Sequence, residues 1–317
     1  ARTSEVSRMD DLILQINDLT VEFNMYDGKF SRAPLRVIDA LSMTVRAGEV
    51  LAVAGSSGSG KSLLAHAILG LLPGNASSGG EMLFKGEPLT PERIRKLRGS
   101  EIALVPQSVS YLDPLMRVGA QVAGADRSGG AKLAMKSIFE RFGLSEETER
   151  LYPFQLSGGM ARRVLVSTAA ISGAEPTIAD EPTPGMTLEQ AVEALRVVRE
   201  LADEGRAVVL ITHDVDLACA FADRIAVFYA GTTVETASAE EFRAGESALR
   251  HPYSRALWRA LPQNGFEPIP GRQPYAGSLP DGCLFAPRCP MATDECRSGR
   301  IPMRELRGGE VRCIHAT

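Results

Sequence analysis

The stretch AVAGSSGSGKSLLAHAILG, residues 52–70, decides the fold. Within it, residues 55–62 match the pattern G-x-x-x-x-G-K-[ST] at every fixed position. The run VLAVAG at 50–55 is continuously apolar, as expected of a parallel strand that is buried on both faces. After Lys61, apolar residues recur at helical spacing through Leu71. The local prediction is a buried strand, a glycine-rich turn and a helix.

This turn has the composition of a phosphate-binding loop. Glycines let the backbone bend so that successive N–H groups point into one concavity, and the following helix N-terminus also attracts anions. Lys61 adds a point charge for β and γ phosphates, and Ser62 offers a hydroxyl to Mg²⁺. The predicted phosphate-binding residues are Gly55, Ser56, Ser57, Gly58, Ser59, Gly60, Lys61 and Ser62.

The composition excludes several classes of protein. The chain has 317 residues, of which 44% are hydrophobic and 23% charged, as in a soluble protein with a sizeable core. The net charge of −4 gives no general attraction to nucleic acid, so none is expected as a partner. No run of apolar residues is long enough to span a bilayer, and ARTSEVSRMDDLILQ at the N-terminus lacks the apolar core of a secretory signal. We therefore expect a cytoplasmic protein, which can still dock onto a membrane protein.

Strand and helix patterns alternate along the first 240 residues. Residues 14–23 and 41–55 are rich in β-branched residues, and further strands are expected at 177–180, 207–214 and 224–231. The segment 187–205 has the pattern of an amphipathic helix, and 108–165 is mostly helical and more polar. Alternation of this kind predicts an α/β fold with a parallel sheet, into which the helical stretch at about 108–165 is inserted.

The composition changes near residue 250. Nine of the nineteen prolines lie between Pro252 and Pro302, and four of the five cysteines follow the same boundary. This change predicts a separate, loop-rich extension with little helix or strand. The predicted division is therefore 1–249 and 250–317.

Five motifs in sequence order resemble those of an ABC-transporter nucleotide-binding subunit, over about residues 12–240. After the phosphate loop come Gln107 in LVPQS, LSGGM at 156–160, IADEP at 178–182 and His213 in LITHD. The resemblance implies a P-loop NTPase fold, with a RecA-like parallel core, an antiparallel β subdomain and an inserted helical subdomain. It also implies ATP and Mg²⁺ as cofactors and ATP hydrolysis as the reaction.

The same resemblance assigns roles to individual residues. Glu181 would be the catalytic base, His213 the switch histidine and Gln107 the Q-loop residue, with Mg²⁺ held through Ser62, Gln107 and Asp180. Asp180 ends a strand and offers the carboxylate oxygens that Mg²⁺ prefers. Adjacent residues of a strand point to opposite faces, so the roles of Asp180 and Glu181 are separable. In the family, the signature residues Ser157, Gly158 and Gly159 would contact ATP bound to the opposite subunit.

The C-terminal region names a narrower group. RHPYSRAL at 250–257, GCLFAPRCPMATDEC at 282–296 and the final VRCIHA resemble the C-terminal region of oligopeptide and dipeptide importer ATPases, a group that includes nickel importers. In this group the cysteines look like a [4Fe–4S] site, which would be held by Cys283, Cys289, Cys296 and Cys313. Zinc, or free thiols and a disulfide, remain open as alternatives. Cys219 is expected to be a small core residue.

The resemblance also implies an assembly. We expect a second ABC ATPase chain, two transmembrane permease subunits and an extracytoplasmic substrate-binding protein, with this chain on the cytoplasmic face of the membrane. The expected function is ATP-driven uptake of oligopeptides or dipeptides. Uptake of nickel or a metal chelate is the alternative, and a soluble ABC ATPase without a transport role is a remote one.

Two features depart from the family pattern. The D-loop, usually PTTALD, reads PTPGMT at 182–187, so that Thr187 replaces the usual aspartate and communication with the partner subunit is expected to differ. The aromatic residue that stacks on adenine is not obvious. Tyr26 and Phe23 are candidates, although the expected alignment falls nearer Leu35 and Arg36.

Overall fold

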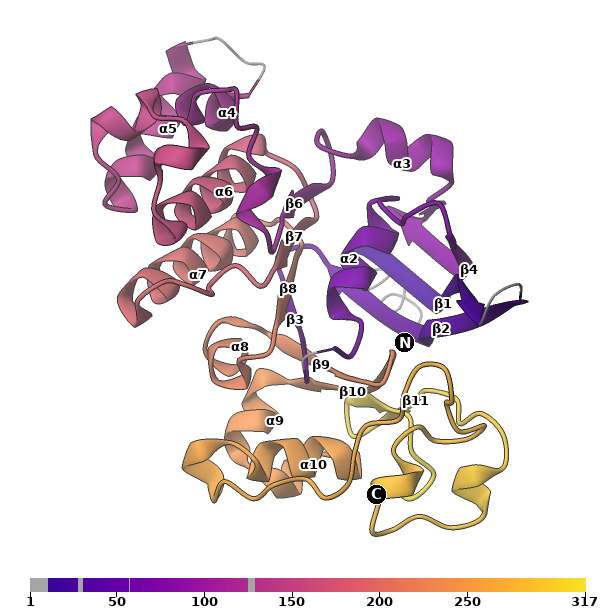
Figure 1. The fold of residues 1–317 in the computed structure, drawn as a ribbon. Helices are drawn as coiled ribbons and strands as arrows, with labels where there is room; N and C mark the ends of the chain where they lie inside the picture. The colour runs from indigo at the N-terminus through magenta and orange to yellow at the C-terminus, as the bar shows by residue number, and fades with distance from the viewer. Residues whose placement is uncertain (1–10, 28–30, 57, 125–128) are drawn as a thin grey trace.

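The computed structural model describes residues 11–27, 31–56, 58–124 and 129–317. Ser57, one of the predicted phosphate-binding residues, lies outside the described residues. The larger sheet has the strand order β11-β12-β10-β9-β3-β8-β7-β6, and a second sheet has the order β2-β1-β4-β5 (Figure 1). The larger sheet is made of β3 (Val50–Gly55), β6 (Ala103–Val105), β7 (Thr177–Asp180), β8 (Val208–Thr212), β9 (Arg224–Tyr229), β10 (Thr232–Ser238), β11 (Arg304–Leu306) and β12 (Gly309–Val311).

The centre of the larger sheet is parallel, as the alternation of strands and helices predicts. Strand β3 pairs in parallel with both β8 and β9, and β7 pairs in parallel with β8 and β6. Every residue of β3, β7 and β8 is buried, which explains why their sequences are short apolar runs without alternation. Because parallel strands all end at the same edge of a sheet, the segments that follow β3, β7 and β8 meet there.

The second sheet is antiparallel and covers one side of the core. It is made of β1 (Leu12–Asp27), β2 (Ser31–Arg46), β4 (Ala76–Phe84) and β5 (Glu87–Pro88). Helix α2 (Lys61–Ile68) packs against this sheet through a shared apolar cluster that includes Leu14, Ile38 and Leu64. The predicted parallel core with an antiparallel β subdomain is therefore confirmed.

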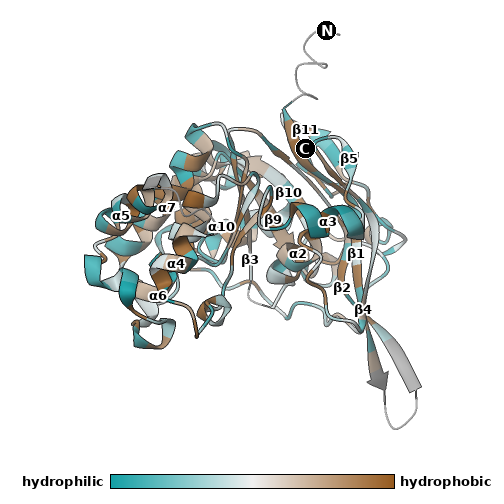
Figure 2. Cartoon of the chain, turned by 90° about the horizontal axis from the view of Figure 1, so that it is seen from above, coloured by the Kyte–Doolittle hydropathy of each residue, from teal (hydrophilic) through white to brown (hydrophobic). Residues whose placement is uncertain are grey.

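Helices cover the other side of the larger sheet (Figure 1). They are α4 (Val118–Ala123), α5 (Gly129–Arg141), α6 (Gly158–Ser172), α7 (Leu188–Asp203) and α8 (Val215–Phe221), while α3 (Pro91–Leu97) lies beside the antiparallel sheet. The predicted limit of the helical insertion, near 165, falls inside α6, because this helix runs on to Ser172 and leads into β7. Hydrophobic residues concentrate on the central strands and hydrophilic ones on the outer faces of α3 and α5 (Figure 2). No helix in the described ranges is both long and apolar enough to cross a bilayer.

The C-terminal region is less separate than its composition suggests. After α9 (Ala239–Ala244) and α10 (Pro252–Arg259), residues 262–303 contain only short 3₁₀ turns, as expected. Strands β11 and β12 then pair with each other, and β12 pairs antiparallel with β10. The extension therefore has little regular structure, as expected, but it is not separate, because its last strands extend the main sheet. Three-residue strands give almost no periodic signal in a sequence, and the pairing partner lies far away in the chain.

A buried ion pair fixes this region to the core. The side chain of Arg250 is inaccessible to solvent, and its Nη1 lies 3.3 Å from Oε1 of Glu235, which is equally buried. Arg250 also donates to the carbonyl oxygens of Leu306 and Arg307, at 2.6 and 2.7 Å. Glu235 accepts from the main-chain N–H groups of Arg250 and His251, at 2.8 and 2.7 Å. The pair therefore joins β10, which carries Glu235, to main-chain groups at the start of α10 and at the β11–β12 turn.

Removing one member of this pair should destabilise the protein strongly. We expect Glu235→Ala to lower the free energy of unfolding by about 3–5 kcal/mol, because Arg250 would keep only Glu241 as a carboxylate partner and the buried N–H groups of Arg250 and His251 would lose their acceptor. The measurement is the midpoint of urea denaturation. The control is Glu92→Ala, which breaks the exposed pair between Glu92 and Arg95 and should cost less than about 1 kcal/mol. Similar losses in both variants would contradict this account.

Candidate nucleotide site

The phosphate loop connects β3 to α2, and its glycines are required by its path. A Cβ atom on Gly55 would lie 2.2 Å from the carbonyl oxygen of Phe228, a distance that no side chain tolerates. Gly60 precedes the first residue of α2 and has φ of 100°, in the left-handed region that favours glycine. Ser59 Oγ donates to the carbonyl of Ser56 at 2.8 Å, which closes the turn. The loop therefore forms the bend that the motif predicts.

Lys61 lies inside the curve of this loop. Its Nζ donates to the carbonyl oxygens of Gly55 and Ser56, at 2.8 and 3.0 Å. Burial lowers the pKa of Lys61, and the nearby carboxylates Glu181 and Asp180 partly oppose that change. The ammonium group is thus held in the concavity by two neutral carbonyls, which a phosphate oxygen could replace as a stronger, charged acceptor.

Two of the three predicted Mg²⁺ ligands lie side by side. Ser62 Oγ donates to Oδ1 of Asp180 at 3.1 Å, across the edge where β3 and β7 end. Burial raises the pKa of Asp180, while the bond from Ser62 lowers it and the charge of Glu181 raises it further. Gln107, the third predicted ligand, is linked to the site through its main chain. The contact that links it to the site is made by its main-chain carbonyl, which accepts from Arg162.

Glu181 and His213 form a second pair at the same edge. Oε2 of Glu181 lies 2.8 Å from Nδ1 of His213, and the Glu181 side chain is only 8% exposed. Asp180 contacts Ser62 whereas Glu181 contacts His213, so the adjacent carboxylates do face different partners. Glu181 has φ of 47°, a left-handed conformation that is uncommon outside glycine and asparagine. A glutamate and a histidine in contact at this position can together orient a water molecule and accept its proton.

Arg162 was not singled out by the sequence analysis, yet it joins three motifs. It lies on α6, three residues after the signature glycine Gly159. Its Nη1 donates to the carbonyl oxygen of Gln107 and, at 3.1 Å, to that of Glu181. Burial lowers the pKa of Arg162, and its Nε is buried without a partner among the described residues. An arginine in an amphipathic helix gives no sequence signal for this role, because most such residues are solvated.

The signature residues form the N-terminus of α6. Ser157 caps the helix by accepting from the N–H of Met160 at 3.3 Å, and Ser157 and Gly158 are exposed. A Cβ on Gly159 would lie 3.4 Å from the carbonyl oxygen of Gly185 in the D-loop. Because Ser157 and Gly158 are exposed, the N-terminus of α6 lies at the surface of the chain.

The altered D-loop keeps a helix cap. Thr187 caps α7 by accepting from the N–H of Gln190 at 3.4 Å, and the Gln190 side chain accepts from the N–H of Thr187 at 3.3 Å. Threonine and aspartate are both good N-cap residues, so the replacement is tolerated locally. The change therefore removes a carboxylate from this surface without disturbing the start of α7.

The four C-terminal cysteines lie near one another as free thiols. The N–H of Cys283 donates to the carbonyl of Cys296 at 2.8 Å, and all five cysteines of the chain are unpaired. Burial raises the pKa of Cys283 to about 11 and also raises those of Cys289 and Cys313, with smaller contributions from the neighbouring thiols. Within the described residues, no group of three or more His, Cys, Asp or Glu side chains could hold a metal ion. The predicted [4Fe–4S] site and the zinc alternative therefore find no support in this arrangement, and no disulfide is formed, which leaves the free-thiol alternative. Cys219 is half-buried on α8, and burial raises its pKa to about 11.

Comparison with known proteins identifies the family. The model of the ABC transporter family matches residues 38–184, and that of the oligopeptide/dipeptide transporter C-terminal region matches 234–296. The dipeptide transport ATP-binding protein DppD of Escherichia coli is 36% identical over 323 residues, which cover 96% of both chains. The chain belongs to the ABC transporter family. The prediction of an ABC-transporter ATP-binding subunit of the oligopeptide and dipeptide group is therefore confirmed.

Other relatives agree with this assignment. The oligopeptide transport ATP-binding protein OppD of E. coli is 34% identical to this ABC subunit over 320 residues, covering 95% of this chain and 92% of OppD. Among solved structures, the dimeric ATP-binding cassette MJ0796 bound to ADP and Pi superposes with a TM-score of 0.63, over 72% of this chain and 99% of that one. Its 23% identity supports the fold alone.

The Arg162 contacts predict a separation of binding from turnover. We expect Arg162→Ala to reduce ATP turnover about 10- to 100-fold while ATP affinity changes less than about 3-fold, because Gln107 and Glu181 lose the donor that holds their main chains. Turnover and nucleotide affinity would be measured on the same preparations. The control is Arg206→Ala, which removes a bond to Ala170 at the other end of α6. Unchanged turnover in Arg162→Ala would show that the arginine only packs the helix.

Proposed function

We propose that this chain is the ATP-hydrolysing subunit of an importer that couples ATP hydrolysis to uptake of oligopeptides or dipeptides across the cytoplasmic membrane. The observation that carries the proposal is the pairing at the edge of the sheet: Ser62 with Asp180, and Glu181 with His213, beside the loop that holds Lys61. The names of the relatives, the dipeptide transport protein DppD and the oligopeptide transport protein OppD, support peptides as the cargo.

The residues present suit an ATP-dependent reaction. Residues 55–62 would hold the phosphates, with Lys61 turning from the carbonyls of Gly55 and Ser56 to phosphate oxygens. The adjacent oxygens of Ser62 and Asp180 would hold Mg²⁺, with Gln107 as a further ligand, and this hard cation would neutralise charge on the phosphates. Glu181 would accept the proton of the attacking water, with its carboxylate oriented by His213.

A second cassette would complete the site. The outward-facing N-terminus of α6, with Ser157, Gly158 and Gly159, is suited to approach the phosphates of ATP held by another subunit. ATP between two cassettes would hold them together, and loss of the γ phosphate would release them. The closeness of Gly159 to Gly185 links the signature to the D-loop, so the change from aspartate to Thr187 lies on the proposed interface.

The assembly follows from the same family. We propose a second ATPase chain of different sequence, two permease subunits and an extracytoplasmic binding protein as partners, with this chain at the cytoplasmic face of the membrane. Nickel or a metal chelate remains the alternative cargo, because the cassette itself does not need to touch what is transported. A soluble ABC ATPase is disfavoured by the match to the oligopeptide/dipeptide transporter C-terminal region.

The chain would divide into an ATPase domain at 1–249 and an extension at 250–317 that holds a [4Fe–4S] cluster. The donor set supports this finer assignment: of the four thiols two are buried, and neighbouring thiols contribute to the raised pKa values of Cys283, Cys289 and Cys313. A four-iron cluster is larger than a single ion and needs thiolates that stand farther apart. Its role here would be structural, joining the loops that carry the four cysteines.

The proposed ATPase chemistry predicts that one variant loses ATP binding and another loses turnover. Lys61→Ala should weaken ATP binding about 10-fold or more, because the phosphates lose a charge-assisted partner. Glu181→Gln should keep ATP affinity within about 3-fold but lower turnover at least about 100-fold, because the amide cannot accept a proton. Affinity and phosphate release would be measured for both. Wild-type affinity and turnover in Lys61→Ala would refute the proposal.

The cluster prediction concerns protein purified without oxygen. We expect broad visible absorption, with iron and acid-labile sulfide in equal amounts. Cys313→Ser should abolish all three signals, and Cys219→Ser should leave them unchanged because Cys219 lies on α8 and is not one of the four proposed ligands. Colourless wild-type protein without iron would rule out the cluster and leave ATP binding untouched as a proposal.

A further inference from the structure

We propose that the C-terminal extension forms part of the surface that binds the base of the nucleotide, and that Tyr275 is the ring on which the base stacks. The inference rests on the proposed function, since it requires the phosphate loop to hold ATP. It answers a question that the β1–β2 hairpin leaves open, because the position expected for an adenine-stacking aromatic falls at Leu35 and Arg36.

One contact places the C-terminal extension beside the phosphate loop. Ser56, in the phosphate loop, donates from its Oγ to Oε1 of Gln273 at 2.9 Å, although the two residues are 217 positions apart. Gln273 is half-buried, and it lies only two residues before Tyr275. The segment 269–279 of the extension, here called the extension loop, therefore runs along the rim of the phosphate site.

A second contact places the same loop beside Leu35. A Cβ on Gly277 would lie 2.6 Å from Cε1 of Tyr275 and 3.4 Å from Cδ1 of Leu35. The N–H of Ser278 donates to the carbonyl of Tyr275 at 2.8 Å and closes a turn. The ring of Tyr275 thus lies over Gly277, and a side chain at this position would displace the ring.

Tyr275 has the exposure that a stacking platform needs. It is 72% exposed, so a flat aromatic face is open to solvent next to Leu35. Phe23, which pairs with Leu35 across the β1–β2 hairpin, is partly buried and packs against the hydrophobic core. The side chain of Tyr26, the other candidate from the sequence, lies outside the described residues. Among the described aromatic rings near Leu35, Tyr275 therefore offers the more open face.

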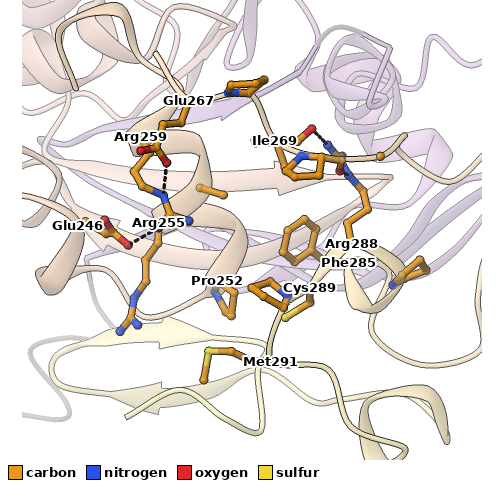
Figure 3. Close-up of a pocket in the computed structure, with 16 residues that line it drawn as sticks. Glu246, Pro252, Arg255, Arg259, Glu267, Ile269, Phe285, Arg288, Cys289 and Met291 are labelled. Atoms are coloured by element: carbon orange, nitrogen blue, oxygen red, sulfur yellow. Dashed lines mark hydrogen bonds and ion pairs between the residues drawn. The ribbon is translucent and has the colours of Figure 1, made fainter. Parts of the chain in front are cut away.

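The extension loop is anchored at its start. Arg288 donates to the carbonyl oxygens of Pro270 at 2.7 Å and Ile269 at 2.9 Å, as the close-up of the neighbouring cavity shows (Figure 3). The same guanidinium donates to the hydroxyl of Tyr229, at the end of β9, at 3.3 Å. The loop is thus held to the main sheet at one end and to the phosphate loop at Gln273, so Tyr275 is placed before any ligand arrives.

A buried tyrosine, Tyr253, lies next to Tyr229 and Ser56. Tyr253 is 2% exposed and packs against Tyr229 with ring centroids 4.4 Å apart. Burial raises the pKa of Tyr253 to about 12, and hydrogen bonding to Ser56 opposes part of that change. Ser56 therefore lies close to both Tyr253 and Gln273, which belong to the region after residue 250. The placement of the phosphate loop and of the stacking ring thus depends on one set of contacts.

The test compares two probes on the full-length chain. ATP carries the base, whereas tripolyphosphate offers only phosphates. We expect Tyr275→Ala to weaken ATP binding about 5- to 100-fold, the usual range for loss of one stacked base, and to change tripolyphosphate binding less than about 2-fold. Tyr275→Phe and Tyr275→Trp should bind ATP like the wild type, since each keeps an aromatic face.

The matched control is Phe266→Ala. Phe266 is also an aromatic residue of the extension and is also 72% exposed, but it donates its N–H to Leu261 and lies outside the extension loop. The Phe266→Ala variant should bind ATP and tripolyphosphate like the wild type. Thermal unfolding of every variant would show that an exposed substitution has left the fold intact.

Three results would overturn the assignment. Wild-type ATP affinity in Tyr275→Ala would exclude a stacking role. Equal losses for ATP and tripolyphosphate would mean that Tyr275 acts only on the phosphate loop. Loss of ATP binding in Tyr275→Phe as well would exclude stacking and leave the hydroxyl as the essential group. All three leave the proposed ATPase standing, whereas a wild-type chain that bound neither probe would refute that function and the stacking role together.

Discussion

The register of three parallel strands is the constraint on which the site depends. Ala54 of β3 lies opposite Thr212 of β8, and Ile211 lies opposite Asp180 of β7. Because the strands end together, the residues that follow them enter one small space. A slip of one residue in any pairing would turn every side chain of that strand to the other face and would separate the pairs formed there. The complete burial of these strands makes such a slip costly, so the packing of the strands fixes the positions of the site residues.

Burial also supports a conformation that the chain would not adopt alone. Glu181 has a left-handed backbone, and its main chain is held from two sides: its N–H donates to Ile211 at 2.9 Å and its carbonyl accepts from Arg162. Strain of this kind costs of order 1–3 kcal/mol and persists only where surrounding contacts compensate for it. Since Arg162 also holds Gln107, a movement of α6 would reach both loops at once. The guanidinium of Arg162 therefore links the signature helix physically to the pair formed by Glu181 and His213.

Short sequence motifs predicted much of this site, because each motif specifies the structure of its own residues. Residues 55–62 and the strand 177–180 specify a turn and a strand end whatever the rest of the chain does, so the phosphate loop and the carboxylates could be placed in advance. Contacts between distant residues could not. Arg162 reaches loops 55 and 19 positions away, and Gln107 is engaged through a carbonyl that every residue possesses. The cysteines indicated their chemistry by type and number, but their spacing did not fix an arrangement, and the thiols stand without a preformed metal site.

The extension illustrates how composition can mislead about independence. Its prolines, glycines and cysteines suggest a module that folds by itself, yet its buried side chains bond mainly to the core. Arg312 donates to Thr233 at 3.2 Å and to Ala40 at 3.0 Å, so it fastens the C-terminus to β10 and to β2 at the same time. Ser56 is then joined to the same region through Gln273. A ligand that contacts both the phosphate loop and the extension stabilises the joined form over the separated one, by an amount that grows with its concentration relative to Kd. A nucleotide bound as proposed would therefore also stabilise the extension against the core, so the composition boundary near residue 250 is bridged by contacts on both sides.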